Sequence, residues 1–388
     1  MVSFCASSPG KILWLGGYSV LEKGNVSFVS AVDRRITACV SPLKEKKVSV
    51  SAPQFSLDFE AEIANGALSS ESLSDSERKK AKFVLSACNV CITYLNALGK
   101  PNNGFRISTF NDSAFGTSEK KTGLGSSAAV TVSSVSAILL AHGFPIGQNH
   151  LQIHNLSQLA HAMAQQKAGS GFDIASATYG SCEYSRFPPE KIEKALNDTN
   201  GKEMRVFASS PLGCRISPLS LPPDFFQVIA YTGKSISTSE MIAKISAFKN
   251  RNPSAYASVM KKLNAENKEA IACLKLLSSG KSTAKKAVSS FKNHFTEGML
   301  ITKKLGEESG AEIEPERFSS LISESESNGA LVSKLPGAGG GDSIAAICIG
   351  RENANALSRF WRKKGLKPMV LNESSEGVRS EKSTVCSI

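Results

Sequence analysis

The spacing of hydrophobic residues predicts strands at the start of the chain and helices after them. Residues 4–21 and 26–42 are rich in β-branched and aromatic side chains and are broken by glycines, which is typical of strands. Residues 76–98 repeat apolar side chains at helical spacing. This segment stops at Gly99, with Pro101 just beyond, and that combination marks the end of a helix.

The same pattern divides the rest of the chain into two parts. The first part continues with a strand at 104–110, helices at 126–142 and 149–166, and a strand and turn at 179–189. Residues 189–221 predict a surface excursion and a domain junction. The second part predicts a strand at 225–233, two or three helices, a glycine-rich loop and strand at 335–350, a helix at 352–365 and a last strand at 367–374.

Length and composition indicate a globular protein of two domains. The chain has 388 residues, of which 41% are hydrophobic, enough for a sizeable core. No apolar run reaches the ~18–20 residues that a membrane span needs, and the N-terminus lacks the pattern of a secretory signal. We therefore expect no membrane partner. The nine cysteines are an odd number without a framework spacing, so we expect reduced thiols.

Two features invite a functional reading but have simpler explanations. Cys88 and Cys91 form a CxxC inside the helical pattern, where a buried helix face is favoured over a redox or zinc site. Residues 241–304 contain thirteen Lys and Arg against three Glu, in a protein of net charge +12. A solvated basic face explains this, and a field that attracts an anionic substrate is an alternative. No aromatic interleaving supports a nucleic-acid partner.

The segment "KKTGLGSSAAV" predicts an anion site at the start of a helix. Gly123 and Gly125 let the backbone approach a ligand, and a helix start offers unpaired N–H groups and a partial positive charge. It lacks the lysine of a P-loop, and Ala128 stands where a dinucleotide fingerprint needs its third glycine. A glycine-serine helix cap without a ligand is the alternative.

Three other segments favour the ligand. Lys11 directly follows Pro9-Gly10 at a strand start, and Asp173 follows a Gly-Ser-Gly turn. "LPGAGGGDS" adds a third glycine-rich loop in the other half of the chain. Together they predict a cleft in which backbone approaches a polyanion.

In this order, the Pro-Gly-Lys strand, the GLGSSA loop, the Asp and the GAGGG loop resemble the GHMP kinase superfamily. The resemblance implies an α+β fold of two domains with the active site between them. The N-terminal domain is expected to resemble ribosomal protein S5 domain 2, with a left-handed βαβ crossover, and the C-terminal domain a ferredoxin-like sandwich. We place the domains at 1–220 and 221–388, with the boundary near "SPLSLPPD".

A finer resemblance is to the phosphomevalonate kinase family of the eukaryotic type. "SPGKILWLGGYSVLE", "QQKAGSGFDIASATYGS", "ESGAEIEP" and "EGVRSEK" carry it. Mevalonate kinase and galactokinase relatives have Gly-Glu-His where Gly16-Gly17-Tyr18 stand. The resemblance implies transfer of the γ-phosphoryl group of ATP to the phosphate of (R)-5-phosphomevalonate, with Mg²⁺. Another GHMP kinase such as mevalonate kinase, and a catalytically silent ligand-sensing relative, are the alternatives.

The resemblance also implies roles for individual residues. Lys11 and Asp173 are the expected catalytic pair, and Ser127 the expected Mg²⁺ ligand. The ATP phosphates are assigned to the segment around the first glycine loop, namely Lys121, Gly123, Leu124, Gly125, Ser126, Ser127 and Ala128. Expected substrate contacts are Tyr18, Lys167, Ser170, Arg186, Gly339, Gly340 and Asp342. A second metal ligand, a glutamate in mevalonate kinases, is not placed.

Several of these residues have a structural alternative. Tyr18 could be a core aromatic, Lys167 a helix cap and Arg186 a surface ion-pair residue. His150, His154 and His161 share helical spacing, but no cysteine or acid completes a metal site, so we read them as core or surface residues. We expect a monomer or homodimer in the cytoplasm. The C-terminal Cys386-Ser387-Ile388 only weakly resembles a peroxisomal address, so a peroxisomal or glycosomal location is the less favoured alternative.

Overall fold

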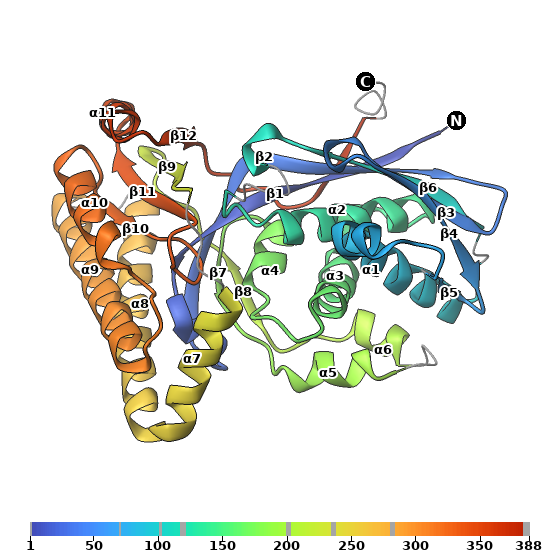
Figure 1. The fold of residues 1–388 in the computed structure, drawn as a ribbon, viewed down its shortest axis with the longest axis horizontal. Coiled ribbons are helices and arrows are strands. Elements are labelled where there is room, and N and C mark those ends of the chain that lie inside the picture. Colours follow the sequence, from blue (N-terminus) through green and yellow to red (C-terminus); the bar gives the residue numbers. More distant parts are fainter. Residues whose placement is uncertain are drawn as a thin grey trace.

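The computed structural model describes residues 2–382 except for 70, 101–102, 117–121, 199–202, 234–237 and 280–283. It contains two sheets, each with its own helices (Figure 1). In the described ranges no helix combines the length and the apolar character that crossing a bilayer requires.

The first sheet has nine strands and carries the N-terminal segment. Seven form the path β13-β1-β2-β6-β3-β4-β5, β7 pairs with β2, and β8 pairs with β7. Only the β3–β6 pair is parallel among these strands. Their bounds are β1 (Phe4–Leu15), β2 (Val26–Pro42), β3 (Lys47–Ala52), β4 (Leu57–Ala64), β5 (Ala67–Leu68), β6 (Phe105–Asn111), β7 (Cys182–Ser185), β8 (Arg215–Pro218) and β13 (Arg379–Glu381).

Helices cover one face of this sheet (Figure 1). They are α1 (Asp75–Ala97), α2 (Ser126–Ala141), α3 (His150–Gln165) and α4 (Phe172–Tyr179), followed by the peripheral α5 (Glu190–Leu196) and α6 (Met204–Ser209). α2 carries small and apolar side chains around most of its circumference and packs on β1, β2, α1 and α3, which is why most of its residues are buried. The element that holds the central glycine loop is therefore fixed by the core.

The second sheet has the order β10-β11-β9-β12 and is antiparallel throughout. Alternate residues of β11 face opposite layers: Ile344 packs towards α10 and α11, and Ala345 towards α8 and α9. The elements are β9 (Phe225–Tyr231), β10 (Val332–Lys334), β11 (Ser343–Ile349), β12 (Lys367–Leu371), α7 (Thr238–Arg251), α8 (Pro253–Ser278), α9 (Ala284–Ser309), α10 (Glu316–Ser327) and α11 (Arg351–Lys363).

Several sequence predictions need correction. The described residues between β9 and the glycine loop form four helices, not two or three, and β12 is not the last strand because β13 follows it. The segment 189–221 contains α5, α6 and β8, and α4 begins where only a glycine break was predicted. The elements α4, α5, α6 and β8 are short, so each contains too few apolar residues for its periodicity to be recognised in the sequence.

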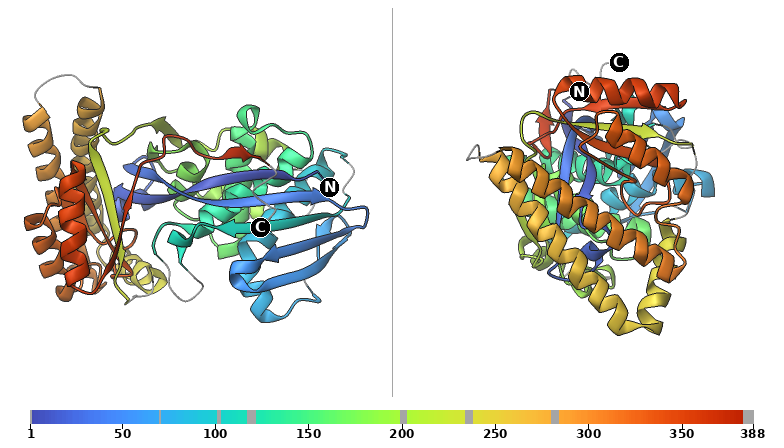
Figure 2. Two further views of the ribbon diagram at one scale, coloured as in Figure 1. Left: turned by 90° about the horizontal axis from the view of Figure 1, so that it is seen from above. Right: turned by 90° about the vertical axis from the view of Figure 1, so that its left-hand side faces the viewer.

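The chain passes between the two sheets twice. It leaves the first sheet after β8 and enters the second at β9, and it returns after β12 to add β13 beside β1 (Figure 2). Glu373, between β12 and β13, links this segment to the one between β8 and β9, because its carboxylate accepts the Leu221 N–H at 2.9 and 3.1 Å. Burial raises the pKa of Glu373 to about 7. The division at 220/221 stays a prediction, and it did not anticipate the return of the C-terminal segment.

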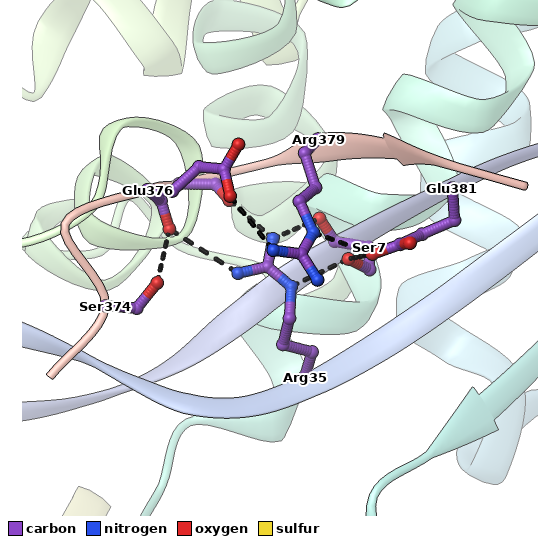
Figure 3. Close-up of polar contacts among 7 residues, drawn as sticks. Ser7, Arg35, Ser374, Glu376, Arg379 and Glu381 are labelled. Atoms are coloured by element: carbon purple, nitrogen blue, oxygen red, sulfur yellow. Dashed lines mark hydrogen bonds and ion pairs between the residues drawn. The ribbon is translucent and has the colours of Figure 1, made fainter. Parts of the chain in front are cut away.

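A polar cluster fastens the returning segment to the first sheet (Figure 3). Arg35 donates to the carbonyls of Ser7 at 2.8 Å and Gly377 at 2.5 Å. The Ser7 hydroxyl donates to Glu381 at 2.6 Å, and Arg379 pairs with the same carboxylate at 2.8 Å. These bonds hold β13 against β1.

In the described residues the cysteines form one disulfide, and the free thiols are buried except for the partly exposed Cys214. Cys5 and Cys39, which face each other on β1 and β2, form a disulfide, so the expectation of reduced thiols throughout is wrong for this pair. Cys88 and Cys91 are free and fully buried in α1, and burial raises the pKa of Cys88 to about 12. The interpretation of the CxxC as a helix face is confirmed. Cys386 lies outside the described residues.

Candidate active site

The first glycine loop opens directly into α2. Gly123 and Gly125 have φ of 78° and 76°, a conformation that favours glycine. Gly125 is the N-cap of α2 and no side chain caps the helix there. The Ala128 N–H donates to the Gly125 carbonyl at 3.1 Å, so the N–H groups of Ser126 and Ser127 are left for another acceptor. Leu124 is buried at 1% exposure, and Ala128 is fully buried. The loop thus has the anion-binding form that its sequence predicts.

Lys11 lies against this loop. Its backbone N–H donates to the Leu124 carbonyl at 2.9 Å, and its ammonium donates to the Gly123 carbonyl at 3.2 Å. A Cβ atom on Gly125 would lie 2.6 Å from Lys11 Cε, so only glycine leaves the lysine in place. Lys11 is 9% exposed. Burial lowers its pKa, and the nearby Asp173 carboxylate partly offsets that effect.

Asp173 lies in the first turn of α4. The turn before it requires glycine, because Gly171 has φ of 82° and a Cβ there would lie 2.5 Å from Phe187. One carboxylate oxygen of Asp173 accepts the Ile174 N–H at 3.0 Å, and the other lies 3.8 Å from His161 Nε2. Lys11 and Asp173 are near enough to interact electrostatically but do not form a direct ion pair among the described contacts.

Ser127 is joined to a residue that sequence reasoning missed. Its hydroxyl lies 3.2 Å from Nε2 of His161, which is 4% exposed on α3. Burial lowers the pKa of His161 more than Asp173 raises it. No cluster of three metal-ligating side chains occurs in the described ranges. His161 itself is nevertheless part of the site. The sequence signal that could have pointed to His161 was its place on α3, the helix directly before the one that carries Asp173.

The predicted substrate contacts occupy two different settings. Tyr18 is buried, and its hydroxyl donates to the Ala338 carbonyl at 2.8 Å. Arg186 donates to the Leu21 and Gly169 carbonyls at 2.5 and 3.0 Å, while its Nε is buried without a partner. Arg186 thereby fixes the turn that leads to α4, rather than pairing at the surface.

Two further predicted contacts lie in that turn. The Ser170 carbonyl accepts the Tyr184 hydroxyl at 2.8 Å. Lys167 is exposed, and its N–H caps α3 through Ala162 O at 3.2 Å. Their role as substrate contacts stays a prediction. Lys121 lies outside the described residues.

The second glycine loop approaches the first from the other sheet. Gly340 donates its N–H to Ile313 O at 2.9 Å, and a Cβ on Gly339 would lie 2.2 Å from the same oxygen. The Asp342 carbonyl accepts the Thr232 N–H at 3.1 Å. These contacts fix the loop that was expected to close over the substrate.

In the part of the chain that the structure describes, a hydrogen bond joins the two loops. The Ser343 hydroxyl, at the start of β11, donates to the Thr122 carbonyl at 2.8 Å. The Thr122 hydroxyl is buried without a hydrogen-bond partner. The loops predicted to hold polyanions therefore lie side by side.

Lys334, directly before the second loop, was also missed. It lines a cleft together with Tyr18, Asn267, Thr302 and Gly339. Its ammonium donates to the Leu13 and Trp14 carbonyls at 3.3 and 3.2 Å, and burial lowers its pKa to about 8. Lys334 thus ties the second loop to β1, the strand that carries Lys11.

Comparisons with known proteins agree with this architecture. The family models "GHMP kinases N terminal domain" and "GHMP kinases C terminal" match residues 83–181 and 284–367. A phosphomevalonate kinase of Saccharolobus solfataricus is 32% identical over 381 residues, covering 97% of this chain and 98% of that protein. A peroxisomal phosphomevalonate kinase of Arabidopsis thaliana is 26% identical, covering 96% and 95%.

A solved structure supports the fold. Streptococcus pneumoniae phosphomevalonate kinase, in complex with phosphomevalonate and AMPPNP, superposes with a TM-score of 0.75 over 96% of this chain and all of that one, at 17% identity. At this level of identity, the structural similarity supports only the two-domain α+β architecture. The full-length similarity to the archaeal enzyme, the family models and the order of the glycine loops lead to one conclusion: this chain belongs to the GHMP kinases, in the phosphomevalonate kinase family.

Proposed function

We propose that the chain transfers the γ-phosphoryl group of ATP to the phosphate of (R)-5-phosphomevalonate, forming ADP and (R)-5-diphosphomevalonate. The observation that carries this proposal is the convergence of Lys11, Ser127 and Asp173 at the uncapped start of α2. Full-length relatives named for this activity support the choice of substrate.

The acceptor determines what the protein must supply. A phosphate monoester, with a second pKa of about 6, is largely deprotonated at pH 7 and needs little help from a base. The main barrier is the approach of two polyanions, so neutralising charge is more important than removing a proton. Lys11 offers a buried ammonium at the phosphate loop for this purpose. Asp173 orients the lysine and the acceptor.

The residues present fit Mg²⁺. This ion takes oxygen ligands and usually keeps only one or two from the protein, with nucleotide phosphates and water completing the shell. Ser127 supplies a hydroxyl beside the helix start, and the Asp173 carboxylate approaches the same histidine nitrogen. When bound, the ion would offset the charge of the β- and γ-phosphates. The orphaned hydroxyl of Thr122 is a further oxygen at the loop.

The remaining residues divide between the two substrates. We assign the triphosphate to the segment from Gly123 to Ala128 and to Lys121, which lies outside the described residues. The 5-phosphate of the acceptor is assigned to the turn formed by Lys167, Ser170 and Arg186, and to Tyr18. Gly339, Gly340 and Asp342 close the site from the second domain. We infer a cytoplasmic monomer or homodimer; the segment that resembles a peroxisomal address lies outside the described residues.

A comparison of acceptors tests the activity. Purified protein is assayed for ADP release with ATP and either phosphomevalonate or mevalonate, and the product is identified by phosphorus NMR. We expect a diphosphate product from phosphomevalonate and no turnover of mevalonate. Turnover of mevalonate alone would favour the mevalonate kinase alternative. Binding of ATP and phosphomevalonate without turnover would favour a silent sensor.

A further inference from the structure

Three consecutive carbonyl groups of the first glycine loop each accept a hydrogen bond from outside the loop. The Leu124 carbonyl accepts the backbone N–H of Lys11 at 2.9 Å, and the Gly123 carbonyl accepts the ammonium of the same lysine at 3.2 Å. The Thr122 carbonyl accepts the hydroxyl of Ser343 at 2.8 Å. Two of these donors therefore belong to β1 of the first sheet, and the third belongs to β11 of the second sheet.

A fixed carbonyl also fixes the N–H group that follows it in the chain. The described peptide bonds are all trans, and in a planar trans peptide the C=O and N–H bonds point in opposite directions. The three anchored carbonyls therefore turn the N–H groups of Gly123, Leu124 and Gly125 away from the anchoring donors. The orientation of the loop's own donors thus depends on contacts made by its carbonyls.

The N–H groups oriented in this way are not used inside the protein. In the described ranges, none of the five consecutive N–H groups from Gly123 to Ser127 donates to another residue, whereas that of Ala128 donates to the Gly125 carbonyl at 3.1 Å. Carbonyl oxygens carry partial negative charge and repel a phosphate, and N–H groups attract it. The anchors therefore withdraw three acceptors from the anion site and leave a row of donors.

Ser343 holds the first carbonyl of this row from a rigid position. It is 1% exposed and pairs with Tyr231 of β9, and β11 lies inside its sheet, between β10 and β9. An added Cβ on Gly123 would lie 3.4 Å from the Ser343 hydroxyl oxygen, so the serine also lies against the next residue of the loop. The second sheet thereby sets the orientation of the peptide between Thr122 and Gly123.

We propose that Ser343 is a positioning residue for the nucleotide: its hydroxyl holds the Thr122 carbonyl away from the phosphates and thereby directs the Gly123 N–H towards them. The proposal rests on the proposed function, in which the first glycine loop holds the triphosphate of ATP. Ser343 acts through the loop and not by contact with the nucleotide. Without its hydroxyl this peptide is free to turn, and nucleotide binding must restore its orientation at a cost in affinity.

Two serine substitutions separate this role from a general effect on stability. Ser343→Ala removes the donor to the first loop. Ser333→Ala is the matched control, because Ser333 on β10 is also buried, at 3% exposure, and its hydroxyl also donates to a backbone carbonyl, that of Ala345 at 3.2 Å. That bond stays within the second sheet. Thermal unfolding should show a similar, small loss of stability in both variants.

The readout is calorimetric titration with AMPPNP, a non-hydrolysable ATP analogue, and separately with phosphomevalonate. We expect Ser343→Ala to weaken AMPPNP binding by about 5-fold, which is within the net contribution of one hydrogen bond. Its affinity for phosphomevalonate should stay unchanged, and Ser333→Ala should bind both ligands as the wild type does. A purely structural role of Ser343 would not distinguish between the two ligands.

Several outcomes would overturn the proposal. They are wild-type affinity for AMPPNP in Ser343→Ala, an equal loss in Ser333→Ala, an equal loss for both ligands, and absence of AMPPNP binding to the wild type. Wild-type turnover of phosphomevalonate is measured in parallel. Absence of that turnover rejects the proposed function, whereas the AMPPNP affinities of the two variants still decide the role of Ser343.

Discussion

Replacing Gly125 with alanine should separate the stability of the fold from the activity of the site. The φ of 76° costs an L-residue about 1–2 kcal/mol. The added Cβ would also lie 2.6 Å from Lys11 Cε, so the lysine must move by about 1 Å to reach an ordinary carbon–carbon contact of ~3.5 Å. A flexible lysine end moves at little cost in stability, but a 1 Å displacement at a reacting centre can lower the rate about 100-fold.

Gly99→Ala is the matched control. Gly99 has φ of 67° at the end of α1, and a Cβ there meets no atom within 4 Å. Both variants should lose about 1–2 kcal/mol in the free energy of unfolding, measured by denaturant titration. Only Gly125→Ala should lose kcat in the ADP-release assay, by about 100-fold. Near-normal kcat in Gly125→Ala, or an equal loss in Gly99→Ala, would refute the reasoning.

Three further predictions concern other groups. Asp173→Asn should lower kcat far more than it weakens ATP binding by calorimetry; near-normal turnover would remove Asp173 from the mechanism. Arg35→Ala should destabilise the protein by about 1–3 kcal/mol in denaturant titration, because it leaves the Gly377 carbonyl without its partly buried donor, whereas Arg34→Ala, which removes ion pairs of 3.7 and 3.9 Å, should change stability little. Because the pKa of Glu373 rises to about 7 on folding, the folded state binds the extra proton and the contribution of this group to stability declines as pH rises from about 4.5 to 7. The free energy of unfolding of Glu373→Gln, relative to that of the wild type, should therefore be higher at pH 8 than at pH 5. The same difference at both pH values would count against a raised pKa of the buried carboxyl.

The long, strongly periodic elements could be predicted from the sequence. The helix expected at 76–98 is α1, and those expected at 126–142 and 149–166 are α2 and α3, each within one residue at either end. Periodicity and glycine stop signals are local, so they need no knowledge of the fold. The disulfide and β13 depend on which strands become neighbours, and local pattern does not contain that information.

The residues of the candidate site also divide into those with a local sequence signal and those without one. Its glycine loops and Lys11 could be located because a strained backbone and a charge beside it leave a local signature. Tyr18 was undecided between a core and a substrate residue, and the structure shows why: its ring is buried while its hydroxyl reaches the second glycine loop. Such a residue contributes to both packing and the site, and sequence alone does not separate the two.

The residues that sequence reasoning missed act through contacts between distant segments. His161 reaches Ser127 across 34 positions, and Lys334 reaches the carbonyls of β1 across more than 300. Both are buried and mainly hold other groups in place, so neither needs a motif around it. Lys334 joins the second domain to the strand of Lys11, and His161 joins three helices at Ser127. The placement of the expected catalytic groups therefore depends on buried polar side chains whose partners only the folded chain brings together.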